Sequence, residues 1–282
     1  MKKFLLEKKI NVLTLIIAIA FTAAVSVPFA SGRGGSPGLT ENTVGAESAE
    51  GTKSAESIES AASSGEEGWE ELYNLASKDA MTIEEEEILP VLAISKEEDL
   101  VRWNDEGKVL MLTFHRYPES YVPGQEAVTE FGQVWVTSLP EMEAWFAENY
   151  GDGTTPKEGW TARFEMLLGM PADGSHTHFS ALWADPEDLT RPAYNPDAAD
   201  DQVLVQLPED VDEEYKQWFD ENIIWSYFDS WYPWTRLGYT YDYADNGTEY
   251  GLSEFLVNQN STVDVEFTYT VDEMVEYLKG IK

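Results

Sequence analysis

Two of the three histidines in this chain stand two residues apart, in Ser175-His176-Thr177-His178. Residues two apart on a β-strand point to the same face, so these two imidazoles can share one metal ion. His115, at the end of another apolar stretch, would supply a third ligand. Three histidines with an open fourth position form a catalytic zinc site, in which the pKa of the bound water falls to about 7. The alternative is that His176 and His178 lie where a loop joins a strand and make only local hydrogen bonds.

An acidic segment that starts at Asp242 resembles a calcium-binding loop. Asp242 at position one, Asn246 at position five and Gly247 at position six suit an EF-hand. Ala244 occupies position three, and Ser253 occupies position twelve, where that motif requires a bidentate glutamate. The plainer interpretation is a turn in which Asn246 and Gly247 supply the positive φ angles.

Aromatic residues are most dense between positions 225 and 243. Such rings stack on the faces of sugars, and nearby carboxylates accept hydrogen bonds from sugar hydroxyls. The side chains that would line a binding groove of this kind are Trp234, Arg236, Tyr241 and Asp242. The alternative is a core in which a helix packs on a strand. In either case we expect Arg236 to be a buried or half-buried charge, because aromatic faces and carboxylates both suit its planar guanidinium.

Three parts of the chain, at residues 117–124, 182–192 and 233–257, together resemble a group of uncharacterised exported bacterial proteins. The resemblance extends from about Val109 to the end of the chain. It implies a single domain and carries no known activity.

A second resemblance is to ADP-ribosyltransferase-like toxins. Glu254 followed by an apolar run, a short turn and the strand at 263–267 has the shape of the segment that carries the catalytic glutamate of that family. An early strand of the family ends in arginine or histidine, as 114–116 does here. Leu252 stands where the arginine-specific members have a first glutamate. The resemblance implies an active site in which one cleft gathers His115, Arg116, Tyr239 and Glu254.

The spacing of apolar residues predicts the elements that would position these side chains. Helices are predicted from Trp69, from a capping box at Ser95 up to Gly107, and at residues 138–146, 160–168, 212–228 and 271–278. Strands are predicted at residues 108–115, 131–137, 177–183, 236–241, 254–257 and 262–268, the last two as a hairpin. Helices and strands alternate without a regular βαβ rhythm. We therefore predict an α+β fold, a single mixed domain with a mostly antiparallel sheet and several packed helices.

The N-terminal region predicts export. Residues 1–30 combine a lysine-rich start, an apolar run and small residues, as in a signal peptide or an uncleaved N-terminal anchor. Residues 31–68, rich in Gly, Ser, Ala and Glu, predict a disordered linker, and residues 69–282 predict the globular domain. We therefore expect an extracellular or cell-surface protein whose only membrane contact would be residues 10–30, if they remain uncleaved.

Charge and motifs limit the function. Eighteen basic residues face 53 acidic ones, for a formal charge of −35, which excludes nucleic acid as a partner. The chain has no cysteine, and no nucleophile, phosphate-loop or dinucleotide motif. The sequence identifies no cofactor. It favours a binding module with a carbohydrate or protein partner. The alternative is an extracellular enzyme, either ADP-ribosyltransferase-like with Glu254 and His115 or Arg116, or a metal-dependent hydrolase with His115, His176 and His178.

Overall fold

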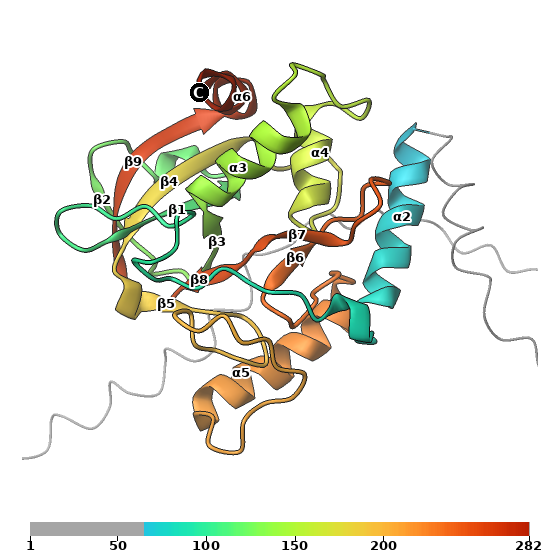
Figure 1. Cartoon of the computed structure of the whole chain (residues 1–282), viewed down its shortest axis with the longest axis vertical. Coiled ribbons are helices and arrows are strands. Elements are labelled where there is room, and N and C mark those ends of the chain that lie inside the picture. Colours follow the sequence, from blue (N-terminus) through green and yellow to red (C-terminus); the bar gives the residue numbers. More distant parts are fainter. Residues whose placement is uncertain (1–64, 282) are drawn as a thin grey trace, which may run out of the picture. The chain divides into compact units, whose positions relative to one another are not determined.

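A computed structural model describes residues 65–281 of the chain (Figure 1). The predicted signal peptide or anchor and most of the predicted linker lie outside these residues. The centre of the fold is an antiparallel sheet with the strand order β2-β9-β4-β1-β3-β8-β5. The strands are β1 (Val109–His115), β2 (Glu126–Val128), β3 (Val134–Ser138), β4 (His178–Ala184), β5 (Leu189–Thr190), β8 (Phe255–Val257) and β9 (Thr262–Thr270). A separate pair consists of β6 (Tyr239–Tyr241) and β7 (Tyr250–Ser253).

The α-helices are α2 (Gly65–Asp79), α3 (Leu139–Tyr150), α4 (Trp160–Leu167), α5 (Glu213–Ile224) and α6 (Val271–Gly280). Short 3-10 turns occur at η1 (Glu85–Glu87), η2 (Pro118–Ser120) and η3 (Pro186–Asp188), and the π-helix η4 (Trp225–Asp229) continues α5. These elements confirm the predicted α+β class, the antiparallel sheet and the packed helices. Within residues 65–281, no helix combines the length and the apolar character needed to cross a bilayer.

The two faces of β1 belong to two hydrophobic cores. Leu110, Leu112 and Phe114 pack with α3, α4 and α6 on one face of the sheet. Val109 and Met111 point to the other face, which forms a second core. That core contains residues of both β8 and β9, although β3, β1 and β4 separate these strands in the sheet. The sheet is therefore strongly curved around its second core.

The predicted hairpin of residues 254–268 is wrong. β8 pairs with β3 and β5, whereas β9 pairs with β4 and β2. The chain between them crosses the open side of the curved sheet, where the Thr129 N–H donates to Ser261 O at 3.0 Å and the Asn260 N–H donates to Thr129 O at 3.1 Å. A short apolar strand pattern shows which face is buried, but it does not identify the partner strand.

The predicted helix after Ser95 is also wrong. The Ser95 hydroxyl accepts the N–H of Glu97 at 3.1 Å, but only turns and extended chain follow. Trp103 forms a β-bridge with Val109, and Val101 is buried in the second core. Tertiary packing of these apolar side chains thus overrides a local capping signal. The other predicted helices and strands occur within a few residues of their expected positions.

Candidate functional site

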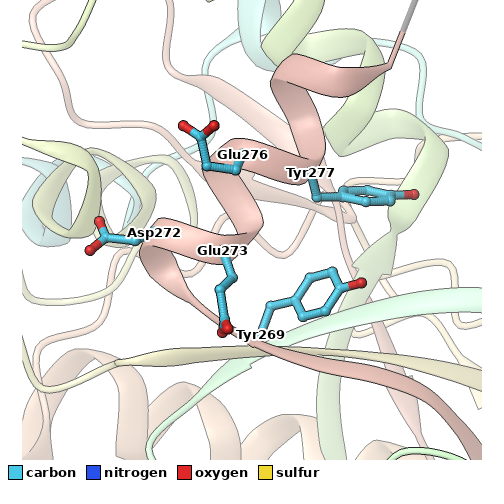
Figure 2. A pocket seen from close by; sticks show the side chains of 5 residues that line it. All are labelled: Tyr269, Asp272, Glu273, Glu276 and Tyr277. Atoms are coloured by element: carbon cyan, nitrogen blue, oxygen red, sulfur yellow. The ribbon is translucent and has the colours of Figure 1, made fainter.

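A pocket of about 430 Å³ lies where β9 passes into α6. Five side chains line it, namely Tyr269, Asp272, Glu273, Glu276 and Tyr277, and most of the lining surface is apolar. Figure 2 shows the Tyr269 and Tyr277 rings beside each other and the Glu273 side chain next to Tyr269. The site is a shallow, open depression, and we consider it for ligand binding because a mainly apolar surface with a few polar groups is typical of ligand sites.

The strand-to-helix junction positions these side chains. Thr270 is the N-cap of α6, and its hydroxyl accepts the N–H of Glu273 at 3.3 Å. The Glu273 carboxylate accepts the Thr270 N–H at 2.8 Å in return, which completes a capping box. Glu273, Glu276 and Tyr277 then share one helix face, because residues three and four apart are neighbours on a helix. The junction turns Tyr269 toward the same face.

The two tyrosine rings form a fixed corner. Their centroids lie 6.0 Å apart, and the ring planes are inclined at 53°. Tyr269 stacks on Phe267 at 4.1 Å, and the Tyr277 hydroxyl donates to Glu143 Oε1 at 2.7 Å. Burial and the Glu143 carboxylate raise the pKa of Tyr277 to about 12, so its hydroxyl stays protonated. Both rings are therefore held in place by contacts outside the pocket.

The rim of the pocket is anionic. Asp272, Glu273 and Glu276 are exposed. The Thr270 N–H and hydroxyl lower the pKa of Glu273, which keeps this carboxylate ionised at neutral pH. Lys279 Nζ lies 3.1 Å from Glu276 Oε1, as an exposed pair that contributes little. The pocket thus offers apolar ring faces together with hydrogen-bond acceptors, and its lining residues include no histidine.

The residues predicted for an ADP-ribosyltransferase-like site do not converge. The sheet register places Glu254 next to Phe255, which pairs with Val136, while His115 ends β1 two strands away. With about 4.8 Å between strands and about 3.4 Å per residue, these side chains start about 14 Å apart. The buried Tyr239 directs its hydroxyl to Glu87 O at 2.8 Å. Arg116 is exposed.

His115 is part of a hydrogen-bond chain at the end of the second core. The Tyr117 N–H donates to His115 Nδ1 at 3.1 Å, and His115 Nε2 lies 2.8 Å from Ser180 Oγ. Burial lowers the pKa of His115 to about 4, and His178 and His176 add to this effect. The neutral ring therefore carries its proton on Nε2 and donates to Ser180, whose hydroxyl bonds to Thr268 at 2.7 Å. Both ring nitrogens are engaged, so His115 suits neither a metal ion nor the activation of Ser180.

Glu254 belongs to a buried polar group. Burial raises the pKa of Glu254 well above its usual range, and the nearby Arg191 only partly opposes this shift. Arg191 is fully buried, and its Nη2 donates to Leu92 O at 2.8 Å and Asp200 O at 3.0 Å. A Cβ on Gly238 would lie 2.6 Å from Arg191 Cδ, so the close approach requires glycine. Glu254 is therefore buried beside Arg191 and presents no exposed carboxylate for catalysis.

The side chains predicted to line a sugar-binding groove are buried and have partners within the protein. Trp234 Nε1 donates to Pro192 O at 2.9 Å, and the Tyr241 hydroxyl donates to Asp79 at 2.9 Å. Arg236 is 8% exposed, which confirms the expected buried charge. It has a φ of +62° and donates through Nη1 to the Tyr194 hydroxyl at 3.0 Å. These contacts match the alternative interpretation, a packed core.

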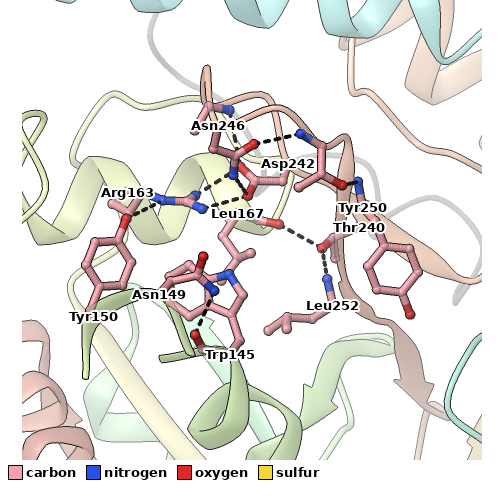
Figure 3. Close-up of polar contacts among 12 residues, drawn as sticks. Trp145, Asn149, Tyr150, Arg163, Leu167, Thr240, Asp242, Asn246, Tyr250 and Leu252 are labelled. Atoms are coloured by element: carbon pink, nitrogen blue, oxygen red, sulfur yellow. Dashed lines mark hydrogen bonds and ion pairs between the residues drawn. The ribbon is translucent and has the colours of Figure 1, made fainter. Parts of the chain in front are cut away.

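Asp242 forms the centre of a buried network (Figure 3). It accepts two hydrogen bonds from Arg163 and one from Asn246 Nδ2 at 2.8 Å. Its N–H donates to Glu249 O, and Gly247 has a φ of +83°. The segment is thus a turn, as the plainer interpretation predicts, but only Gly247 and not Asn246 has a positive φ. The Asp242 oxygens are already occupied by protein donors.

His176 and His178 have different surroundings. His178 lies on β4 opposite His115, with ring centroids 6.4 Å apart. His176 precedes the strand, and its Nδ1 lies 3.3 Å from Glu165 Oε1. Asp173 completes a group with Glu165 and His176 whose ligand atoms lie within 4.8 Å of one another. His176 can therefore serve as a metal ligand, but its partners in the described part of the chain are carboxylates rather than His115 and His178.

Sequence reasoning missed the pocket residues, although one signal was present. Thr270 and Glu273 form a capping box in the sequence, and tyrosines flank it at 269 and 277. Arg163 and Arg191 were missed as well, because nothing local shows that a charged side chain will be buried. No protein-family model, curated protein or solved structure matches this chain significantly. The geometry of the site is therefore the basis for its function.

Proposed function

We propose that this chain is an exported binding domain and that the pocket between β9 and α6 binds a ligand through an alkylammonium group. The observation that supports this proposal is the corner formed by the Tyr269 and Tyr277 rings beside an anionic rim. The ring centroids lie 6.0 Å apart, and the ring planes are inclined at 53°. A cation over aromatic faces is attracted by their quadrupoles, by about 0.5–1 kcal/mol at exposed sites and about 2 kcal/mol when desolvated. Inclined rings allow one cation to contact two faces.

The charges of the rim favour a cation over a neutral sugar. Asp272, Glu273 and Glu276 supply only acceptors, and a ligand that covers them must replace their hydration. An ammonium group offsets this loss through opposite charge, whereas a sugar offers only neutral hydroxyl donors. The formal charge of −35 also attracts cations to the protein as a whole. A carbohydrate remains the competing ligand class in the experiment below.

Export is the second part of the proposal. Its support is the sequence of residues 1–30, in which lysines precede an apolar run and small residues. Fusion of residues 1–40 to a reporter that is active only outside the cytoplasm tests it. We expect reporter activity, and we expect its loss when charged residues interrupt the apolar run. If the intact fusion shows no reporter activity, export is contradicted.

Calorimetric titration with small probes tests the ligand class. We expect tetramethylammonium and butylammonium to bind with Kd values on the order of 1 mM, which corresponds to about 4 kcal/mol. Neopentyl alcohol, a neutral molecule of similar shape, should bind at least tenfold more weakly. Ammonium binding should weaken as salt screens the exposed rim. Binding of N-acetylglucosamine without binding of either ammonium probe would replace the cation with a carbohydrate and overturn the proposal.

A further inference from the structure

We propose that Glu165, Asp173 and His176 form a second site, which binds one divalent transition-metal ion such as Zn²⁺. The site is separate from the pocket between β9 and α6. Each of the three residues offers one ligand atom, and these atoms lie within 4.8 Å of one another. They come from α4 and from the loop between α4 and β4, so the fold brings together residues up to 11 positions apart.

The spacing of two ligand atoms suits a metal ion. His176 Nδ1 lies 3.3 Å from Glu165 Oε1, which is long for a charge-assisted hydrogen bond of about 2.7–2.9 Å. Zinc binds imidazole nitrogen and carboxylate oxygen at about 2.0–2.2 Å, so a tetrahedral ion separates two such atoms by about 3.3–3.5 Å. The Ser175 hydroxyl, 3.2 Å from the same nitrogen, is the other polar neighbour of Nδ1.

Hydrogen bonds within the protein organise the loop between α4 and β4 around Glu165. Glu165 is fully buried, and its carboxylate accepts the N–H groups of Gly174 at 3.0 Å and His176 at 3.2 Å. Gly174 has a φ of +70°, which permits the tight turn. Asp173 Oδ1 accepts the Ser175 N–H at 2.8 Å. Outer hydrogen bonds of this kind orient the ligands of metal sites.

A buried hydroxyl in the same part of the fold provides an independent observation. Tyr73 is 8% exposed, and its hydroxyl has no hydrogen-bond partner among the described residues. Tyr73 belongs to the buried cluster against which Ala172, the residue before Asp173, packs. A buried hydroxyl without a partner is unfavourable by about 1–3 kcal/mol. A bound water or ligand atom in this part of the fold would therefore be favourable next to the Tyr73 hydroxyl.

The donor set selects the kind of metal. One imidazole with two carboxylates suits zinc and other transition metals, whereas calcium takes six to eight oxygen ligands. Three protein ligands leave a position for water or for a ligand group, because Asp173 is exposed and His176 is half-buried. The alternative explanation of the same contacts is a loop that Glu165 holds in place through hydrogen bonds alone. This alternative predicts that the protein does not bind Zn²⁺ at the three residues.

Titration of the full chain with Zn²⁺ alone tests the proposal. After removal of metal with a chelator, excess Mg²⁺ is added so that exposed carboxylates are occupied. We expect one Zn²⁺ per chain by calorimetry and a rise in melting temperature on zinc addition. His176→Gln and Asp173→Asn should each weaken zinc binding at least tenfold. Asp173→Asn retains the oxygen that accepts the Ser175 N–H, so this variant keeps the loop contact.

The chain offers a matched control in His178→Gln, which removes the neighbouring histidine and should leave zinc affinity unchanged. A second control is Tyr269→Leu, which alters the ammonium pocket and should also leave zinc affinity unchanged. Zinc that does not bind, or that binds equally to the His176→Gln and Asp173→Asn variants, would overturn the metal site. Either result would leave the ammonium proposal standing, because the two sites share no residue.

Discussion

Arg163 and Asp242 form a bidentate ion pair in the protein interior, with Nη1–Oδ1 at 2.9 Å and Nη2–Oδ2 at 2.6 Å. The pair joins α4 to the turn that follows β6, and both side chains are at most 3% exposed. Removal of one partner leaves the other charge buried, which destabilises a protein by about 3–5 kcal/mol. We expect Asp242→Asn to lower the free energy of unfolding by this amount in denaturant titrations.

Asp245→Asn is the matched control for that change. Asp245 lies in the same turn but is exposed, so its substitution should change the free energy of unfolding by no more than about 0.5 kcal/mol. Equal effects of the two substitutions would show that the ion pair is not what holds the turn on α4.

The buried carboxyl group of Glu141 should make the free energy of unfolding depend on pH. Burial raises the pKa of Glu141 from 4.5 to about 7, although the Ser253 N–H and hydroxyl lower it. The folded state thus binds more protons than the unfolded state between these values, and stability falls as pH rises from about 4.5 through 7. A shift of this size corresponds to about 3 kcal/mol. Glu141→Gln should remove about 3 kcal/mol of this decrease, measured by unfolding at several pH values, and leave the part that the buried Glu254 contributes.

Glu148→Gln serves as the control for Glu141, since Glu148 lies on the same helix and is exposed. Its profile should follow that of the unaltered protein. If Glu141→Gln keeps the full decrease between pH 4.5 and 7, the protons come from another group, and the assignment to Glu141 is wrong.

Gly251 on β7 allows a close approach of three segments. A Cβ at this position would lie 2.2 Å from Thr240 Oγ1 and 2.4 Å from Leu167 O. Figure 3 shows the Thr240 hydroxyl between Leu167 O and the Leu252 N–H, with hydrogen bonds of 2.7 and 2.9 Å. We expect Gly251→Ala to lower the free energy of unfolding by about 1–3 kcal/mol, because the added methyl group overpacks this site. The measurement is the melting temperature, which should fall. Gly280→Ala, whose Cβ would meet nothing within 4 Å, should not lower it.

The elements that the sequence predicted correctly are those with strong local patterns. β1 is an almost continuous apolar run, and α6 begins with a capping box and keeps one apolar face. The hairpin of residues 254–268 failed because β8 and β9 each look like a strand, while their partners are set by curvature of the whole sheet. Sequence alternation determines the faces of a strand, but not its neighbours.

The candidate sites show the same limit of prediction from sequence, because residues far apart in the chain form them. The sequence offers His176 as a candidate metal ligand, but Glu165 lies on α4 and Asp173 on the loop, so their meeting with His176 depends on how that loop folds back. Glu254 looked like a catalytic residue next to an apolar strand. Its burial beside Arg191 depends on segments 63 and 16 residues earlier in the chain, at Arg191 and Gly238, which no local pattern connects.

Removal of one aromatic ring tests the proposed binding function most directly. The measurement is calorimetric titration of tetramethylammonium into the unaltered protein, the Tyr269→Leu variant and the Tyr117→Leu variant. Tyr117 is 61% exposed and does not line the pocket, so it controls for the loss of a tyrosine. We expect Tyr269→Leu to weaken binding by about fivefold or more, which corresponds to about 1 kcal/mol of cation–π attraction, and Tyr117→Leu to bind as the unaltered protein does. Equal affinity of all three proteins, or an unaltered protein that does not bind the cation, would contradict the proposed binding function.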